Sequence, residues 1–128
     1  MKNLLMLSTL TLSLMFSAGS SAEWTQVSES VGGVKTYVDF DRIRKVKGLV
    51  YYWDLRDLLE PSSAGDLSHK IYTKADCDTM RSMKLSFSAY NLPMAEGAAN
   101  ITFTPDPNWD YAQPDSVLEG TLQAVCAH

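Results

Sequence analysis

Residues 82–89 read Ser-Met-Lys-Leu-Ser-Phe-Ser-Ala, the clearest strand pattern in the chain. Its even positions carry serine or lysine, whereas its odd positions are apolar: Met83, Leu85, Phe87 and Ala89. Successive side chains of a strand point to opposite faces of a sheet. The period of two therefore predicts an antiparallel strand with one face on the core and the other in water.

Strand patterns also occur on both sides of this stretch. Residues 49–55 alternate in the same way, but Val50 and Tyr52 make the second face apolar too, which predicts a central strand. Weaker strand patterns cover residues 24–29, 34–39, 67–75 and 101–104. The glycine pair Gly32-Gly33 predicts a tight turn between the first two strands.

The period changes near the C-terminus. Residues 116–119 read Ser-Val-Leu-Glu and match a capping box, in which the serine and glutamate side chains bind free amides at a helix start. Apolar residues then recur at helical spacing up to Val125. We therefore expect an α+β fold: a small, mainly antiparallel sheet of about six strands with a C-terminal helix packed on one face.

The first 22 residues have the three parts of a secretory signal. Lys2 supplies the positive charge, residues 4–16 form the apolar segment, and Ser20-Ser21-Ala22 provides a cleavage site before Glu23. We expect one domain over residues 23–128, in the periplasm or secreted. No cysteine stands directly after the cleavage site, so we expect no lipid anchor.

The cysteines of the chain are Cys77 and Cys126. An even number of cysteines in an exported protein predicts a disulfide, and two buried thiols are the alternative. Closing a loop of about 50 residues would restrict the unfolded chain by roughly 4 kcal/mol.

The charge balance argues against nucleic acid as a partner. The 128 residues include 11 basic and 15 acidic side chains, a net charge of −4. Without Lys2 the balance becomes 10 basic to 15 acidic residues, a net charge of −5. A domain with this balance has no general attraction to a phosphate backbone.

Residue patterns for catalysis or metal binding are sparse. The histidines are His69 and His128, without zinc-site spacing, and the chain has no G-x-S-x-G or phosphate-binding glycine motif. We therefore expect no catalytic residue, metal or cofactor. Carboxylates do recur in pairs near predicted strand ends, where aspartate commonly forms turns: Asp39/Asp41, Asp54/Asp57, Asp76/Asp78 and Asp106/Asp110. A hydrolase that uses one such pair is the least favoured function.

One basic run stands out on this acidic chain. Residues 42–47 carry four positive charges, on Arg42, Arg44, Lys45 and Lys47, which we take as the candidate partner-binding residues. A solvated connection between strands explains the run equally well. Aromatic residues could also form a binding patch, although we expect the core to take most of them: Trp24, Tyr51, Tyr52, Trp53, Trp109 and Tyr111.

Short motifs follow one another along nearly all of residues 23–128: Trp24, Tyr37-Val38-Asp39, residues 50–55 with Trp53, Ser68-His69-Lys70, Asp76-Cys77 and Val125-Cys126. In their order and spacing the chain resembles the bacterial surface-adhesin protein E family. The resemblance implies an antiparallel sheet with a C-terminal helix, a Cys77–Cys126 disulfide and a non-enzymatic domain that can form a homodimer. It also implies attachment to host matrix or serum proteins.

The leading hypothesis is therefore an exported, non-enzymatic module that binds protein partners. The namesake adhesin is a lipoprotein, whereas this chain has no lipidation cysteine after its predicted signal. That difference keeps a second hypothesis open: a soluble periplasmic accessory domain that docks on another envelope protein.

Overall fold

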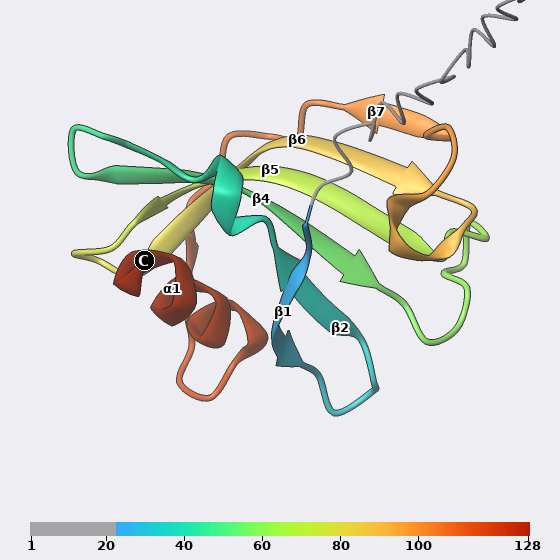
Figure 1. Cartoon of the computed structure of the whole chain (residues 1–128), viewed down its shortest axis with the longest axis horizontal. Coiled ribbons are helices and arrows are strands. Elements are labelled where there is room, and N and C mark those ends of the chain that lie inside the picture. The colour runs from blue at the N-terminus through green and yellow to red at the C-terminus, as the bar shows by residue number, and fades with distance from the viewer. Residues whose placement is uncertain (1–22) are drawn as a thin grey trace, which may run out of the picture.

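The computed structural model describes residues 23–128, which form an antiparallel sheet with a C-terminal helix (Figure 1). In chain order the elements are β1 (Thr25–Glu29), β2 (Lys35–Val38), the 3-10 turn η1 (Phe40–Arg42), β3 (Arg44–Val46), β4 (Leu49–Asp57), β5 (Ser68–Asp76), β6 (Arg81–Tyr90), the 3-10 turn η2 (Pro93–Ala95), β7 (Ile101–Phe103), β8 (Asp110–Tyr111) and α1 (Val117–Ala127). The predicted export signal, residues 1–22, lies outside the described residues.

The six predicted strands form the main path of the sheet, in the order β1-β2-β4-β5-β6-β7. All of these neighbours are antiparallel, and β4 lies inside the sheet as its two apolar faces predicted. Two short strands were not predicted. β3 extends the edge of β4 beyond β2, and β8 pairs with the start of β6.

The C-terminal helix begins where the capping motif predicted. The Oγ of Ser116 accepts a hydrogen bond from the backbone N–H of Glu119 at 3.1 Å. The glutamate does not complete the usual box, because its Oε1 accepts from the N–H of Asp115 at 3.2 Å, while the N–H of Ser116 donates to the carbonyl of Gln113. Free amides at the helix start are thus bound one residue earlier than in the standard motif.

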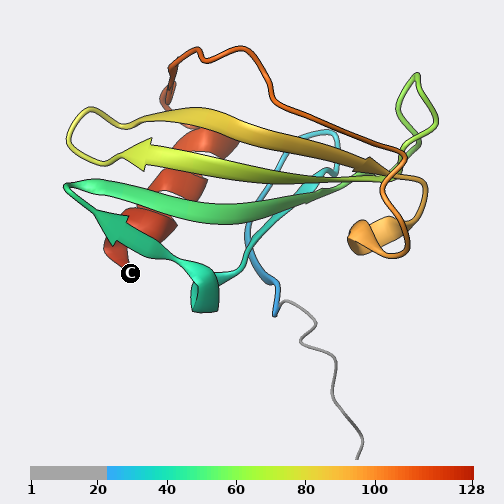
Figure 2. The ribbon, with the colours of Figure 1, turned by 90° about the horizontal axis from the view of Figure 1, so that it is seen from above.

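Helix α1 packs on one face of the sheet, next to β1 and β2 (Figure 1). Its inward residues Leu122 and Val125 are fully buried in a core shared with β2, β4 and β5. Seen from above, α1 passes behind β4–β6, so the opposite face of these strands is free of the helix (Figure 2). We call this opposite side the helix-free face.

The disulfide between Cys77 and Cys126 is present, with a Cα–Cα distance of 5.8 Å. Cys77 begins the turn after β5, and Cys126 lies in the last turn of α1. The bond therefore ties the end of the helix to one end of the central strands. The predicted pairing and the predicted α+β architecture are both confirmed.

The alternation that predicted β6 does not place its apolar residues on one face. Thr73 of β5 lies opposite Lys84, but Tyr72 lies opposite Ser86, so Leu85 is an extra residue in a β-bulge. Because one added residue reverses the faces, Met83 points to the helix-free face and Phe87 to the helix side. The prediction of a single apolar face over residues 82–89 is therefore wrong.

A charged side chain lies on the helix side of β4. Asp54 is 5% exposed, and its Oδ1 accepts no hydrogen bond within residues 23–128. Burial raises the pKa of this carboxyl from 3.8 to about 6, against the positive charges of Arg56 and Lys84, which act to lower it. Loss of hydration without a compensating hydrogen bond disfavours the ionised form.

Removing the disulfide should destabilise the fold strongly. We expect Cys77→Ala/Cys126→Ala to lower the free energy of unfolding by about 4 kcal/mol, because the unfolded chain regains the freedom of a 49-residue separation. Urea unfolding measures this loss. A reductant should cause the same loss of stability in the wild type and leave the double variant unchanged. Equal stability of the oxidised and reduced wild type would contradict a stabilising role for the disulfide.

Replacing Asp54 with asparagine should alter the pH dependence of stability. The folded-state pKa of about 6 lies above the ordinary 3.8. The stabilising contribution of the neutral carboxyl to the folded state is therefore complete below pH 3.8 and is lost as the pH rises through about 6. We expect Asp54→Asn to be more stable than the wild type by about 3 kcal/mol at neutral pH and equally stable in acid.

Urea unfolding at acidic and neutral pH checks this, with the exposed Asp106→Asn as the matched control. If the stability of Asp54→Asn and that of the wild type changed in parallel with pH, Asp54 would not be the cause of the pH dependence.

Candidate binding face

The fold divides the predicted basic run among different surroundings. The Nε of Arg42 lies 3.4 Å from Oδ2 of the buried Asp39. Lys45 is opposite Val50 on the helix side, and its Nζ donates to the terminal carbonyl of His128. Arg42 and Lys45 are thus engaged within the protein.

The other two cations of the run, exposed like the first two, form no ion pair within residues 23–128. Lys47 lies in the turn between β3 and β4, where it takes a positive φ of 50°. Arg44 is directly opposite Tyr51, so its side chain belongs to the helix-free face. The structure therefore does not gather the four predicted residues into one patch, and it brings Arg44 beside a cluster of aromatic rings.

Aromatic rings line up on the helix-free face of β4 and β5. Trp53 is directly opposite Tyr72, and their ring centroids are 4.7 Å apart. The ring of Tyr51 lies 6.2 Å from that of Tyr72. These distances are typical of favourable aromatic pairs. All three rings are partly exposed, so this row is available to a partner as well as packed within itself.

Cations lie against the same rings. The Nζ of Lys70 is 5.3 Å from the centroid of Trp53, and the Nζ of Lys74 is 5.3 Å from that of Trp109. The guanidinium of Arg81 lies 4.1 Å from the ring of Trp109. Attraction between a cation and the face of an aromatic ring fixes the direction of each long side chain.

Arg81 is held from a second side by Asp76. Its Nη2 is 3.4 Å from Oδ2 of Asp76, and its Nη1 donates to the hydroxyl of Tyr111 at 3.4 Å. The pKa of Asp76 is lowered: desolvation acts to raise it, but hydrogen bonds from Thr79 and from the backbone of Asp78, with the charge of Arg81, outweigh that effect. Asp76 therefore stays ionised and keeps Arg81 in place.

We call this surface the aromatic face, and it comprises Arg44, Tyr51, Trp53, Lys70, Tyr72, Lys74, Arg81, Trp109 and Tyr111. Sequence analysis missed Lys70, Tyr72, Lys74 and Arg81 as members. A signal existed, because residues 70, 72 and 74 alternate with the apolar or small Ile71, Thr73 and Ala75 along β5. The expectation that the core takes most of the candidate aromatics is also wrong, since Tyr52 alone of those six is buried.

The paired aspartates do not converge on a common site. Asp54 points to the helix side, whereas Asp57, three residues on, accepts a hydrogen bond from Met94 N–H on the opposite face at 3.0 Å. Asp39 and Asp76 each accept from the backbone N–H two residues later, which confirms their predicted role as turn formers.

The histidines are also separated. His69 Nε2 lies 3.5 Å from Asp66, and burial lowers the pKa of His69. His128 packs against Phe40 at the end of the chain. In residues 23–128 no three His, Cys, Asp or Glu side chains are grouped as metal ligands. Nor does any helix there have the length and apolar character to cross a membrane.

Comparison with solved structures finds the same fold in protein E of Haemophilus influenzae. Crystal form II has a TM-score of 0.62 and 16% identity, covering 84% of this chain and 89% of that chain. The selenomethionine form has a TM-score of 0.61 and 15% identity, covering 84% and 88%. Protein E from a non-typeable strain has a TM-score of 0.57 and 15% identity, covering 86% and 79%.

The comparison with curated protein sequences gives no match. The family model for surface-adhesin protein E, in contrast, matches residues 24–127, nearly all of the described part of the chain. The chain therefore belongs to the surface-adhesin protein E family.

Proposed function

We propose that this protein is an exported, non-enzymatic binding module that recognises a protein partner through its aromatic face. The observation that carries the proposal is the row of Tyr51, Tyr72 and Trp53, partly exposed and flanked by cations on a chain with a net charge of −4. Tryptophan, tyrosine and arginine are the residues that most often dominate binding energy at protein interfaces.

The rigidity of the aromatic face supports this assignment. The aromatic rings stand on neighbouring strands of a hydrogen-bonded sheet, and the cations are held on ring faces or by Asp76. A partner would therefore immobilise few side chains on binding, which lowers the entropic cost of association. The local positive charge favours a partner with an acidic surface.

The predicted basic run contributes unequally under this proposal. Arg44 extends the aromatic face next to Tyr51, and Lys47 lies at the exposed tip of the β3–β4 turn. Arg42 and Lys45 are already engaged by Asp39 and by the chain terminus. We therefore assign direct partner contact to Arg44 and a peripheral charge to Lys47.

Family membership supports a surface-associated place of action outside the cytoplasm, with host matrix or serum proteins as partners. The predicted signal at residues 1–22 agrees with export. Docking on another envelope protein in the periplasm remains the second hypothesis, and the two differ in which extract supplies the partner. The homodimer implied by the family remains a prediction.

Charge reversal on the aromatic face should weaken partner capture. We expect Lys70→Glu/Lys74→Glu to weaken binding by about tenfold or more, because both ammonium groups would become carboxylates beside Trp53 and Trp109. The matched control, Lys35→Glu/Lys45→Glu, makes the same charge change at two exposed lysines away from the rings and should bind like the wild type. Parallel pull-downs from serum, cell-free matrix and envelope extract measure capture, with thermal unfolding to verify folding.

Wild-type affinity should also fall as ionic strength rises, because salt screens exposed charges. Equal loss in both double variants, or capture of single-stranded DNA in place of protein, would contradict the proposal. Capture from envelope extract alone would favour the periplasmic role over host attachment.

A further inference from the structure

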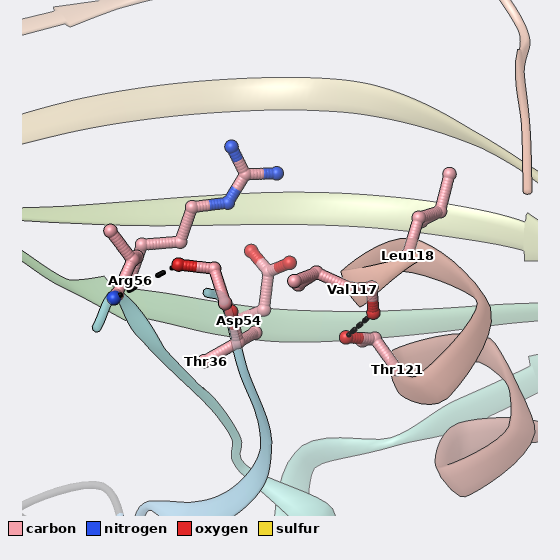
Figure 3. Close-up of a pocket in the computed structure, with 8 residues that line it drawn as sticks. Thr36, Asp54, Arg56, Val117, Leu118 and Thr121 are labelled. Carbon is pink, nitrogen blue, oxygen red and sulfur yellow. Dashed lines mark hydrogen bonds between the residues drawn. The ribbon is translucent and has the colours of Figure 1, made fainter. Parts of the chain in front are cut away.

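A cavity of about 260 Å³ lies on the other side of the sheet from the aromatic face, between the β1–β2 loop, β4 and the first turn of α1 (Figure 3). Its polar wall includes Thr36, Asp54 and Arg56, and its apolar wall includes Val34, Val117 and Leu118. A mainly apolar cavity with a few placed polar groups is the usual form of a small-molecule site.

Two polar side chains of this wall are buried without partners. Asp54 is 5% exposed and Thr36 is 1% exposed. Neither Oδ1 of Asp54 nor Oγ1 of Thr36 forms a hydrogen bond within residues 23–128. Nearby Thr121 offers no donor, because its hydroxyl already donates to the carbonyl of Val117 at 2.9 Å (Figure 3). Buried acceptors without donors are costly, and a bound donor group would remove that cost.

A cation lies at the same cavity. Arg56 is two residues after Asp54 on β4, so both side chains are on the helix side of the strand. The guanidinium of Arg56 forms no ion pair within the described part of the chain. The cavity thus presents one carboxylate and one guanidinium at separate points of its wall (Figure 3).

This combination narrows the ligand class. A simple anion would meet the buried carboxylate of Asp54, and a simple cation would meet the guanidinium of Arg56. A metal ion would find a single carboxylate there, because residues 23–128 contain no cluster of three ligand side chains. A small molecule that carries both charges can pair with Asp54 and with Arg56 at once. Its size is limited, because 260 Å³ is below the roughly 300 Å³ at which sites for drug-sized ligands begin.

We propose that the cavity binds a small zwitterion of the α-amino acid class. The ammonium group donates to Asp54 and Thr36, the carboxylate accepts from Arg56, and a short aliphatic side chain packs on Val34, Val117 and Leu118. Arg56 gives a planar pair of donors suited to a carboxylate. The site is independent of the proposed protein partner, because it lies on the opposite side of the sheet.

The test is an NMR titration of the purified protein at neutral pH with L-valine and L-leucine. We expect saturable shifts of the Thr36, Val117 and Leu118 amide signals, with a Kd of about 1 mM or tighter. The half-molecules of leucine, 3-methylbutylamine and 4-methylpentanoate, each lack one charge and should bind at least about tenfold more weakly.

Two variants identify the charged contacts. Asp54→Asn and Arg56→Gln should each weaken L-leucine binding by about tenfold or more, and the exposed Lys47→Gln, which also removes one positive charge, should not. Asp54→Asn is expected to fold at least as stably as the wild type, so its loss of binding cannot be attributed to unfolding. The proposal is overturned if neither amino acid gives saturable shifts, if Asp54→Asn binds like the wild type, or if either half-molecule binds as tightly as leucine.

Discussion

The structure depends on how the C-terminal helix is fastened to the sheet. A helix of 11 residues with an internal glycine has little stability alone, so it must be held by burial and by cross-linking. Leu122 and Val125 supply the burial, and the Cys77–Cys126 bond supplies the cross-link. Gly120 lies on the side of α1 that meets β1, where a Cβ would make ordinary van der Waals contact with Cβ of Ser28 at 3.6 Å.

Because the helix is attached at one end of the central strands, it leaves two different surfaces. The face opposite α1 carries partly exposed rings and cations, on which the proposed protein recognition rests. The helix side keeps an incompletely filled space at the start of α1, where Asp54 and Thr36 remain without hydrogen-bond partners in residues 23–128. A net negative chain thus has a locally positive face, because β5 places Lys70 and Lys74 on the side away from the helix.

Much of the architecture was predictable because its signals are local. Alternation located two of the six main strands and weaker strand patterns located the other four. Ser116 and the apolar stripe after it located α1, and an even number of cysteines in a chain with a predicted export signal predicted the disulfide. The candidate site was far less predictable. Four positive charges within six residues suggested one basic patch. In the structure, however, Arg44 and Lys45 lie on opposite faces of the sheet, because neighbouring side chains of a strand point to opposite sides.

Local signals in the chain were enough to predict the fold class, the order of the main elements and the disulfide, because periodicity, capping residues and cysteine count act over short stretches or as simple totals. Which side chains meet depended on the folded arrangement. The bulge at Leu85 reversed the faces of β6, and pairing of β4 with β5 stacked Trp53 on Tyr72. Both depend on strand register, which is set by contacts between residues distant in sequence and leaves no mark in any one segment.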